Sequence, residues 1–447
     1  MTLGDTLRHD APGVPVKENV GLRSGLSDDA MLDDLQRAAF DYFLKASNPE
    51  NGLIADTTRA DSPSSIAVVG FALSAYVVGV ERGWIERANA VERTLRTLRF
   101  FLASDQTGSA GATGHRGFYF HFLDMRSGTR AWNSELSLID TALLIAGVLT
   151  AAAYFTADMP AEVEIRTLAD ALYRRVDWRW AQGDGACLTH GWKPECGFLN
   201  YGWEGYSEAL LLYVLGLGSP THPLTEASFP AWTVTYQWEN LYGQEFLYAG
   251  PLFIHQFSHA WIDFRGIQDR FMREKRCDYF ENSRRATYVQ REYATRNPRA
   301  FTGYGADCWG LSAGDGPSAE ARQVAGRRQT FYGYAARGAP YGPDDGTIAG
   351  SATIGALVFA PEIALPALHA MDGRGVRGEL ARAGGFNRTV GGPGSDCWVA
   401  QGEFGLDQGM IVLMIENYRS GMLWRLSRNC AYIRAGLRRA GFRGGWL

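Results

Sequence analysis

Carboxylic acids that stand where a loop enters an apolar helix are the side chains of this sequence best suited to chemistry. Glu208 lies in the segment GYSEALLLY, between a glycine- and aromatic-rich stretch and an apolar run. Burial there would raise its pKa and keep it protonated near neutral pH, as a general acid requires, although a buried glutamate paired with an arginine is an equal alternative. Asp407 stands in GLDQG before the apolar residues 410–415, where it could act chemically or only cap a helix.

Other acidic residues stand at similar junctions. Glu135 begins a helical pattern, where the helix dipole favours a carboxylate and where capping alone would also explain it. Asp140 lies between apolar residues, so it requires a partner or a function. Further candidates for a site shared with these carboxylates are Asp344 and Asp345, which lie in a predicted turn, and Glu416 and Tyr418, which end an apolar helix.

Two histidines, His255 and His259, are spaced four residues apart in HQFSHAW, which is a spacing able to bind one metal ion. Gln256 stands where a zinc protease of the HExxH type has its catalytic glutamate, so that class is disfavoured. We expect the two histidines to bond hydroxyl groups or structural carboxylates. We assign them to the substrate-binding surface, which Trp261 and Arg265 continue. No metal or other cofactor is predicted.

Aromatic residues are frequent, with 13 Trp and 20 Tyr. Their rings offer apolar faces to the CH groups of sugars and polar tips to the hydroxyl groups, which favours a carbohydrate ligand. Most of them will still be ordinary core residues. The rings predicted to stack on sugar units, together with one histidine predicted to bind them, are Trp192, Trp203, Tyr206, Trp261, Trp309, Trp398 and His121.

Composition excludes several classes of function. The 44 basic and 48 acidic side chains give a net charge of −4 without any block of Lys or Arg, which argues against nucleic acid or an anionic membrane as the partner. The six cysteines are scattered and form no CxxC pair, so neither a redox motif nor a zinc knuckle is indicated. Phosphate-binding loops, Rossmann glycine fingerprints and GxSxG nucleophile elbows are likewise absent from the sequence.

The N-terminal residues have no basic region followed by an apolar stretch, so we expect a cytoplasmic protein, or a periplasmic one if the true start lies upstream. The longest apolar run, residues 141–155, is shorter than the roughly 18–20 residues that cross a membrane. No membrane contact is therefore predicted.

Hydrophobic periodicity predicts about twelve helices, and long loops rich in glycine and aromatic residues join them. Such a pattern, without strand alternation or an interdomain linker, predicts an all-α protein: residues 1–28 form an extended arm and residues 29–447 a single (α/α)₆ toroid of six helical hairpins. A helical solenoid is the alternative, but no repeat supports it. The predicted helices cover residues 28–43, 64–81, 85–104, 134–156, 160–180, 203–217, 254–270, 278–296, 351–371, 375–384, 407–422 and 425–440.

A series of motifs gives the sequence a family resemblance over roughly residues 30–445. The chain resembles the glycoamylase-like family, which includes the bacterial β-1,2-glucanases of glycoside hydrolase family 144 and the C-terminal domain of cyclic β-1,2-glucan synthases. The motifs that carry the resemblance are FHFLDM at 120–125, SELSLIDTAL at 134–143, GWKPE at 191–195, GYSEA at 205–209, GSPTHPL at 218–224, HQFSH at 255–259, DYFENSRRA at 278–286, DDGTI at 344–348 and MIENY at 414–418.

The resemblance implies a toroid that hydrolyses β-1,2-linked glucan without a metal, with Glu208 in the position of the proposed acid and Asp407 in that of the proposed base. In the synthase domains, the residue at the position that resembles Glu135 looks like the nucleophile of a retaining mechanism. Both routes stay open, because carboxyl groups roughly 6.5–9.5 Å apart leave room for an inverting water and groups about 5–5.5 Å apart indicate a covalent intermediate. One departure is the pair Gly350 and Ser351, where relatives are expected to carry a proline or a bulkier residue.

The sequence therefore predicts a glycoside hydrolase that cleaves β-1,2-glucan or its oligosaccharides, with an endo-acting and inverting mechanism. The alternatives are a retaining transglycosylase, an exo-acting glucosidase or sophorose-releasing enzyme of the same fold, and a glycan-binding module that has lost catalysis. The expected partner is an oligo- or polysaccharide, and the oligomeric state stays open.

Overall fold

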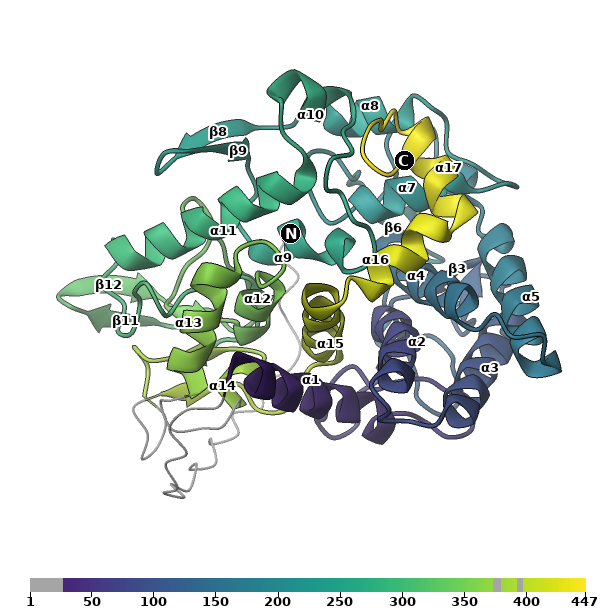
Figure 1. Cartoon of the computed structure of the whole chain (residues 1–447), viewed down its shortest axis with the longest axis horizontal. Coiled ribbons are helices and arrows are strands. Elements are labelled where there is room, and N and C mark those ends of the chain that lie inside the picture. The colour runs from purple at the N-terminus through teal and green to yellow at the C-terminus, as the bar shows by residue number, and fades with distance from the viewer. Residues whose placement is uncertain (1–26, 373–378, 392–396) are drawn as a thin grey trace.

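The computed structural model describes residues 27–372, 379–391 and 397–447 of the chain. Almost all of the predicted N-terminal arm lies outside the described residues, as does the first part of the predicted helix 375–384. Helices form most of the regular structure, and short strands lie in the connections between them (Figure 1). The expectation of a helix-rich fold is confirmed, whereas the expectation of a wholly α-helical one is wrong.

Apolar helices occupy the centre of the molecule, and we call them the inner helices. In the first of them every residue from Ile66 to Gly79 is buried, as expected of a helix that is apolar on all sides. This helix packs against the second and the last inner helix in chain order, and each of the remaining inner helices contacts at least one other inner helix. The inner helices are α2 Ile66–Glu81, α4 Leu138–Tyr154, α7 Leu210–Gly218, α9 Leu252–Gln256 with the 3₁₀ helix η1 Phe257–Ala260, α12 Gly350–Gly355 and α15 Gly405–Arg419.

Amphipathic helices pack around this centre with one apolar face inward. In α1, for example, Leu32, Leu35 and Ala39 are buried, while charged residues line the opposite face. Helices α3 and α5 pack against each other, and α17 packs against α7. The outer helices are α1 Asp28–Lys45, α3 Arg87–Ala103, α5 Pro160–Arg175, α11 Tyr279–Arg296, α13 Pro361–Asp372, α16 Met422–Asn429 and α17 Ala431–Arg439, with the short helices α6 Trp178–Ala181, α8 Ser228–Thr233, α10 Arg270–Lys275 and α14 Glu379–Arg382.

The most extensive helix contact joins α2 and α4, which lie side by side in Figure 1. A Cβ atom at Gly147 would stand 2.0 Å from the carbonyl oxygen of Gly70, and one at Gly70 would stand 2.2 Å from that of Leu143. Only glycine therefore allows the two backbones to approach so closely, and this contact fixes the relative position of the loops that precede the two helices.

Antiparallel strands of two to four residues pair within the long loops, which explains why sequence alternation did not reveal them. The largest sheet has the order β2-β3-β5-β6-β7, and a three-stranded sheet has the order β14-β15-β16. The strands are β1 Ser64–Ser65, β2 Gly114–His115, β3 Phe118–Phe120, β4 Phe122–Leu123, β5 Leu136–Ser137, β6 Gly191–Lys193, β7 Gly197–Phe198, β8 Trp238–Leu241, β9 Gln244–Leu247, β10 Ala313–Gly314, β11 Ala321–Val324, β12 Arg327–Thr330, β13 Ala335–Ala336, β14 Thr347–Ile348, β15 Phe386–Asn387 and β16 Trp398–Val399.

Three helix boundaries differ from the prediction for local reasons. The predicted helix 254–270 ends at Ala260, because the Asp263 carboxylate accepts the backbone N–H of Arg265 in a turn and Gly266 has a φ of +73°. The predicted helix 203–217 begins only at residue 210, after turns around Gly205. The predicted helix 351–371 divides at Pro361, which starts α13 and cannot continue a helix from the preceding residue.

The N-terminal ends of several inner helices lie together. The first backbone N–H of α2, from Ile66, donates to the carbonyl of His121, whose own N–H donates to Glu135 just before α4. The N–H of Gly405 at the start of α15 donates to the carbonyl of Asp56, and the N–H of Asp56 donates to the carbonyl of Pro63 ahead of α2. Loops that are far apart in sequence are thereby joined at one end of the central helices.

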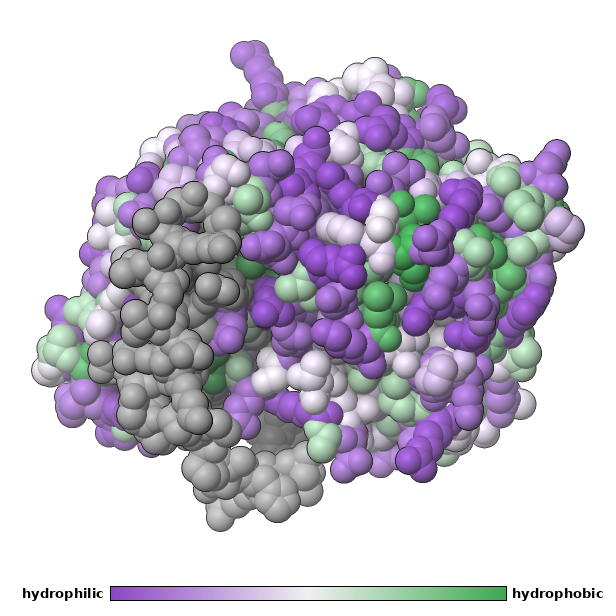
Figure 2. Space-filling view, turned by 60° about the horizontal axis from the view of Figure 1, so that its bottom comes forward, coloured by the Kyte–Doolittle hydropathy of each residue, from purple (hydrophilic) through white to green (hydrophobic). Residues whose placement is uncertain are grey.

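One face of the molecule is mostly polar where it is described (Figure 2). Figure 2 turns toward the viewer the face that lies at the bottom of Figure 1, and hydrophilic residues cover most of what is described there. Among the described residues, no helix combines the length and the apolar character that crossing a bilayer would require.

Candidate active site

Glu208 lies two residues before α7, in the turn that follows Gly205. Burial raises the pKa of its carboxyl group to about 7, the backbone N–H of Glu208 opposes this shift, and the negative charge of Asp140 adds to it. A carboxylic acid with this pKa is still partly protonated at neutral pH. It can therefore donate a proton, as the sequence analysis expects of a general acid.

Ser258 of η1 fixes the backbone at Glu208. Its hydroxyl donates to the carbonyl oxygen of Glu208 over 3.1 Å and accepts the N–H of Leu211 over 3.1 Å. Ser258 is only 3% exposed, so this connection between two inner helices is protected from water. The fixed backbone limits the directions in which the carboxyl group can point.

Asp407 lies in the first turn of α15, and its Oδ1 accepts a hydrogen bond of 2.6 Å from the hydroxyl of Ser351 in α12. The helix dipole and this bond both favour the charged carboxylate, yet burial prevails and raises the pKa of Asp407 to about 7. The charges of Asp315 and Asp56 add to the increase. Asp407 is thus poised between the ionised and the protonated state near neutral pH.

His121 joins Glu135 and Asp140. Its Nδ1 lies 2.9 Å from Oε1 of Glu135 and its Nε2 lies 3.5 Å from Oδ2 of Asp140. Burial opposes a charge on the ring, but Asp140, Glu135 and Asp56 outweigh it and raise the pKa of His121 to about 9. The imidazolium in turn lowers the pKa of Glu135, although burial acts in the opposite direction. Glu135 is therefore an ionised carboxylate at neutral pH, and its partner is charged.

Three residues of this region were not predicted from the sequence. Burial raises the pKa of Asp56 to about 6, with the charge of His121 opposing the shift and that of Asp140 adding to it. The carboxylate of Asp315 forms an ion pair with Arg59. Neither Asp56 nor Asp315 precedes an apolar helical run, which is the signal that singled out Asp407, so the sequence did not reveal them.

Tyr334 is the third of these residues. Desolvation and the charges of Asp407, Asp315, Asp56 and Glu208, in that order, raise its pKa to about 12. The side chain is nevertheless 72% exposed, so it projects into solvent beside the carboxylates. The proposed acid and the proposed base are thus both among the charges that act on Tyr334. We call Asp56, Glu135, Asp140, Glu208, Asp407, His121 and Tyr334 the carboxylate cluster.

The two histidines predicted to contact substrate are core residues, so that prediction is wrong. His255 and His259 are each 1% exposed, and burial lowers their pKa values to about 4 and about 3. His255 pairs with the carbonyl of Ala249, and His259 with the hydroxyl of Ser283. Both imidazoles are therefore neutral and enclosed in the protein, and Nδ1 of His259 has no hydrogen-bond partner among the described residues.

Two of the predicted stacking platforms are also buried. Trp261 is 0% exposed and donates its indole N–H to the hydroxyl of Ser74, and Trp309 is 1% exposed. A sugar ring cannot reach either face of these side chains. They fill the core, which is the ordinary role of a tryptophan that follows an apolar pattern.

The turn residues Asp344 and Asp345 are structural rather than exposed to a ligand. Asp344 accepts hydrogen bonds from the hydroxyls of Tyr293 and Tyr304, over 2.8 and 2.6 Å. Asp345 forms a buried ion pair with Arg337, at 2.7 Å. With exposures of 1% and 0%, neither aspartate can bind a sugar hydroxyl.

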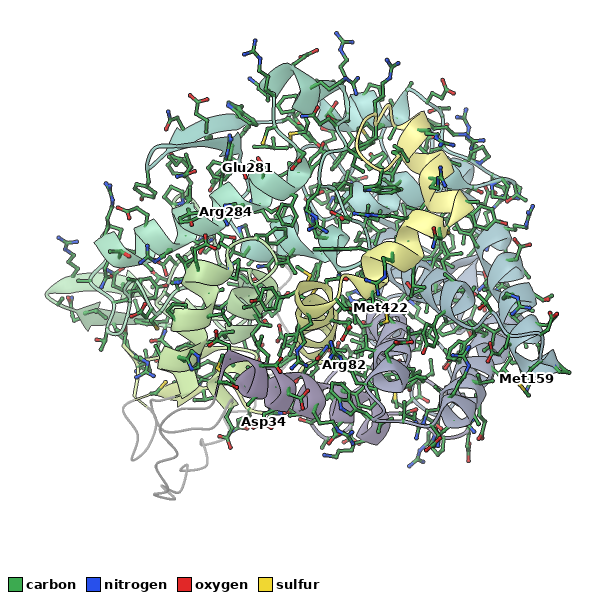
Figure 3. The ribbon with its side chains drawn as sticks, in the orientation of Figure 1. Asp34, Arg82, Met159, Glu281, Arg284 and Met422 are labelled. Atoms are coloured by element: carbon green, nitrogen blue, oxygen red, sulfur yellow. The ribbon has the colours of Figure 1, made fainter. Side chains whose placement is uncertain are left out.

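Glu416 and Tyr418 lie at the wrong end of α15. Nine residues separate Glu416 from Asp407, which corresponds to about 13 Å along a helix. Glu416 is 2% exposed and pairs with Arg82, labelled in Figure 3, at 2.8 Å. Glu416 therefore joins the C-terminal ends of α2 and α15, and Tyr418 stands near it, away from the carboxylate cluster.

The remaining candidates have mixed positions. Arg265 pairs with Asp263 at 2.7 Å and lies over the ring of Trp424 in α16, beyond the C-terminal end of α15, so its prediction as a binding residue is not supported. Four partly buried rings stay predicted stacking platforms. Three of them contact a histidine: Trp192 stacks on His115, Trp203 stacks on His190, and Tyr206 packs edge-on against His255. The fourth, Trp398, lies in β16.

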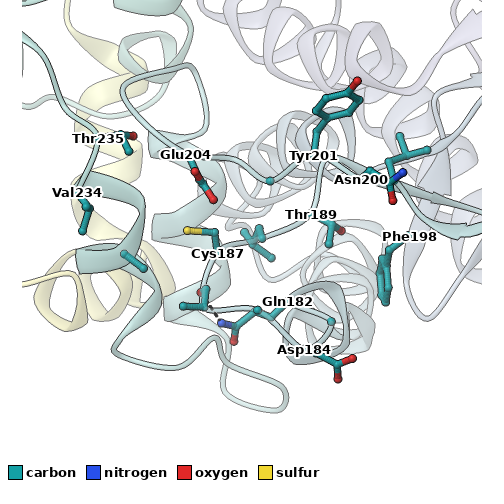
Figure 4. Close-up of a pocket in the computed structure, with 17 residues that line it drawn as sticks. Gln182, Asp184, Cys187, Thr189, Phe198, Asn200, Tyr201, Glu204, Val234 and Thr235 are labelled. Carbon is teal, nitrogen blue, oxygen red and sulfur yellow. Dashed lines mark hydrogen bonds between the residues drawn. The ribbon is translucent and has the colours of Figure 1, made fainter. Parts of the chain in front are cut away.

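A separate open pocket of about 600 Å³ lies between the loop that precedes α7 and the end of α8 (Figure 4). Glu204, Cys187 and Tyr201 are among its lining residues, and Glu208 is not. The pocket therefore adjoins the loop that carries the proposed acid without containing it. Within the described ranges, no group of three histidine, cysteine or acidic side chains is arranged to hold a metal ion.

The sequence of the chain is similar to a protein family and to a characterised enzyme. Residues 200–431 match the model of the glycoamylase family, described as "Putative glucoamylase". The chain is 26% identical over 451 aligned residues to an exo-β-1,2-glucooligosaccharide sophorohydrolase (non-reducing end) of Parabacteroides distasonis, covering 93% of this chain. This chain spans only 58% of the length of that relative.

Solved structures are similar along nearly their whole length. A crystal structure named as a putative glucoamylase from Bacteroides uniformis shares 29% identity and a TM-score of 0.83, covering 95% of this chain and 100% of that one. An endo-β-1,2-glucanase from Chitinophaga pinensis, in complex with sophorotriose and glucose, shares 26% identity and a TM-score of 0.82, with coverage of 95% and 100%.

Proposed function

Because the chain belongs to the glycoamylase family, we propose that it is a glycoside hydrolase that cleaves β-1,2-linked glucan or its oligosaccharides. The observation that carries the proposal is the pair Glu208 and Asp407, two carboxyl groups whose pKa values are both raised to about 7 in one region of the molecule. Hydrolysis of a glycosidic bond requires one protonated and one ionised carboxyl group. The names of the relatives supply the linkage.

In this proposal Glu208 gives its proton to the oxygen of the leaving sugar while the bond between that oxygen and the anomeric carbon breaks. Asp407 takes a proton from the attacking water, whose oxygen forms the new bond on the opposite face. Asp140 and Glu135, the latter paired with the charged His121, bind hydroxyl groups of the sugar. The proposed reaction inverts the anomeric carbon and needs no cofactor.

An endo-acting enzyme is the first choice, since the chain aligns with the full length of the endo-β-1,2-glucanase from Chitinophaga pinensis. A second candidate is a retaining transglycosylase, favoured by one observation: His121 keeps Glu135 ionised, which is the state that a nucleophile needs. The two candidates differ in the anomeric configuration of the first product.

The fold that we propose is an (α/α)₆ toroid formed by residues 29–447 as one domain. Two features support it. Inner and outer helices alternate along most of the chain, and the contacts run from α7 through α4, α2 and α15 to α12 and α9. Hydrogen bonds through Ser258 connect η1 with the start of α7, which closes the series.

Proton NMR during cleavage of linear β-1,2-gluco-oligosaccharides tests the function. We expect new reducing ends that are first in the α configuration, with products of several lengths. Initial β products, or chains longer than the substrate, would instead assign the nucleophile role to Glu135. Release of one disaccharide at a time would indicate an exo-acting enzyme, and no cleavage by the wild type would refute the substrate assignment.

A further inference from the structure

An exposed tryptophan stands close to the carboxylate cluster. Trp132 is 65% exposed, although an indole ring normally contributes most when it is buried. Its ring centroid lies 5.0 Å from that of Phe122, which stacks at 3.9 Å on the ring of His121. Two ring contacts therefore connect Trp132 to the histidine that pairs with Glu135.

The loop that presents Trp132 is rigidly held. The side chain of Arg130 is 1% exposed, and its guanidinium donates to the carbonyls of Ser134, over 2.5 Å, and Asn133, over 2.9 Å. The same guanidinium pairs with Glu195, at 2.6 Å. The backbone on the C-terminal side of Trp132 is thus fixed from inside the protein, while the indole is left in solvent.

The backbone of this loop is also strained. Trp132 and Asn133 have φ values of +55° and +52°, and side chains with a Cβ atom rarely adopt this left-handed region. Trp132 and Asn133 are the two central residues of a tight turn, which the backbone N–H of Ser134 closes by donating to the carbonyl of Ala131 over 3.0 Å. A tryptophan is unfavourable at such a position, and strain of this kind is concentrated at binding sites. The anchoring by Arg130 supplies the constraint, and its result is the outward position of the indole.

We propose that Trp132 is the stacking platform of a sugar subsite of the glucan chain, next to the end of the cluster that holds His121 and Glu135. The inference rests on the proposed function. The flat apolar face of an exposed indole matches the CH face of a glucose ring, and the indole of Trp132 is 65% exposed with Phe122 as its aromatic neighbour. Phe122 separates Trp132 from His121 of the carboxylate cluster. The sugar unit that stacks on Trp132 is therefore not one of the two units joined by the bond that is cleaved.

A subsite of this kind has a kinetic signature. It binds the ground state and the transition state equally, so its loss raises KM and leaves kcat unchanged. The effect is confined to substrates long enough to reach the subsite. A residue that merely supported the fold would change all substrates alike.

The experiment compares kcat and KM of the wild type and of Trp132→Ala, Trp132→Phe and Met159→Ala on linear β-1,2-gluco-oligosaccharides of increasing length. Met159 is a matched control, since it is 62% exposed and lies at the start of outer helix α5, at the right edge of Figure 3. We expect Trp132→Ala to raise KM about tenfold for long substrates only, as for a central aromatic contact. Trp132→Phe should recover most of this loss, and Met159→Ala should behave as the wild type.

The outcomes separate the two proposals. Equal KM values for Trp132→Ala and the wild type at every length would overturn the subsite while the hydrolase assignment stands. A uniform decrease in kcat, with a lower melting temperature, would show that the residue is structural and would also overturn it. A changed oligomeric state with unchanged kinetics would assign the indole to a protein interface instead. A wild type that cleaves no β-1,2-glucan would overturn both proposals.

Discussion

Replacing Ser351 with alanine tests whether a single hydroxyl group sets the protonation of the proposed base. The hydroxyl donates a bond of 2.6 Å to Oδ1 of Asp407 and is a cause that lowers the pKa of that group, against the larger effect of burial. Among the described residues, no other side-chain hydrogen bond contributes to the pKa of Asp407, whereas the charges of Asp315 and Asp56 both raise it. Loss of the hydroxyl should therefore raise the pKa further.

The size of the change follows from the bond. A hydrogen bond to a charged group contributes about 1.5–3 kcal/mol, and one pKa unit corresponds to about 1.4 kcal/mol. The pKa of Asp407 should therefore increase from about 7 by roughly one to two units. At pH 6 the ionised fraction would fall from roughly one tenth to about one hundredth or less.

The assay is kcat/KM for hydrolysis of a β-1,2-gluco-oligosaccharide as a function of pH, which reports the pKa values of the free enzyme. We expect the acidic limb of Ser351→Ala to move upward by at least about one unit. Ser351→Thr, which keeps a hydroxyl, should restore it. Ser104→Ala is the matched control, since it removes a serine hydroxyl that donates to the carbonyl of Phe101 at the end of α3.

If the pH profile of kcat/KM of Ser351→Ala, scaled to the same maximum, coincided with that of the wild type, the hydroxyl of Ser351 would not set the pKa of Asp407. A uniform loss at every pH, with the acidic limb unmoved, would mean that the hydroxyl only positions the carboxylate. The alkaline limb should stay in place in either case, because it reports the proposed acid, Glu208, which has a pKa raised to about 7 by burial.

Three further perturbations test the site and the fold. Glu208→Gln should lower kcat at least about a hundredfold without changing the melting temperature, and a folded variant of full activity would disprove the acid assignment. The pKa of His121 is raised from 6.5 to about 9, so its stabilising effect is complete below pH 6.5 and disappears above about pH 9. Thermal melts of the wild type and His121→Gln should differ most near pH 6 and converge at alkaline pH, and a constant difference would argue against a charged imidazole. Gly147→Ala places a Cβ 2.0 Å from the oxygen of Gly70 and should lower the free energy of unfolding by about 1–3 kcal/mol in urea titrations. Gly111→Ala, which meets no atom within 4 Å, is its control, and equal stability of the two variants would contradict the close contact of α2 and α4.

Local sequence patterns predicted the positions of the main carboxylates because their signal is local. Glu135, Glu208 and Asp407 each precede or begin an apolar helix, and all three are found at such positions. Periodicity also revealed most of the helices. Their partners are not local: Ser351 approaches Asp407 from a position 56 residues away, and Asp315 pairs with Arg59 over 256 residues. No spacing rule connects such residues before the helices are packed.

The wrong predictions share a different cause. In the sequence, the spacing of His255 and His259 and the polar and aromatic residues that continue through Trp261 favour a ligand site. In the structure that segment lies in α9, in η1 and just after it, surrounded by other helices, and its side chains form hydrogen bonds with Ala249, Ser283 and Ser74 inside the protein. A residue type therefore indicates a ligand only when the fold leaves it a face toward solvent, which the sequence does not show.

The shared direction of the inner helices explains why acidic residues at their N-terminal ends can work as a pair. The positive end of a helix dipole stabilises an ionised carboxylate, so Asp407 at the start of α15 would by itself be ionised far below neutral pH. Burial between the loops acts in the opposite direction and raises the pKa of Asp407 and of Glu208 to about 7. At neutral pH, a group with this pKa gains or loses a proton at little cost in free energy. Two such groups can therefore exchange protons with substrate and water in one cycle, and a change that deepens or removes their burial should move the pH optimum before it changes the fold.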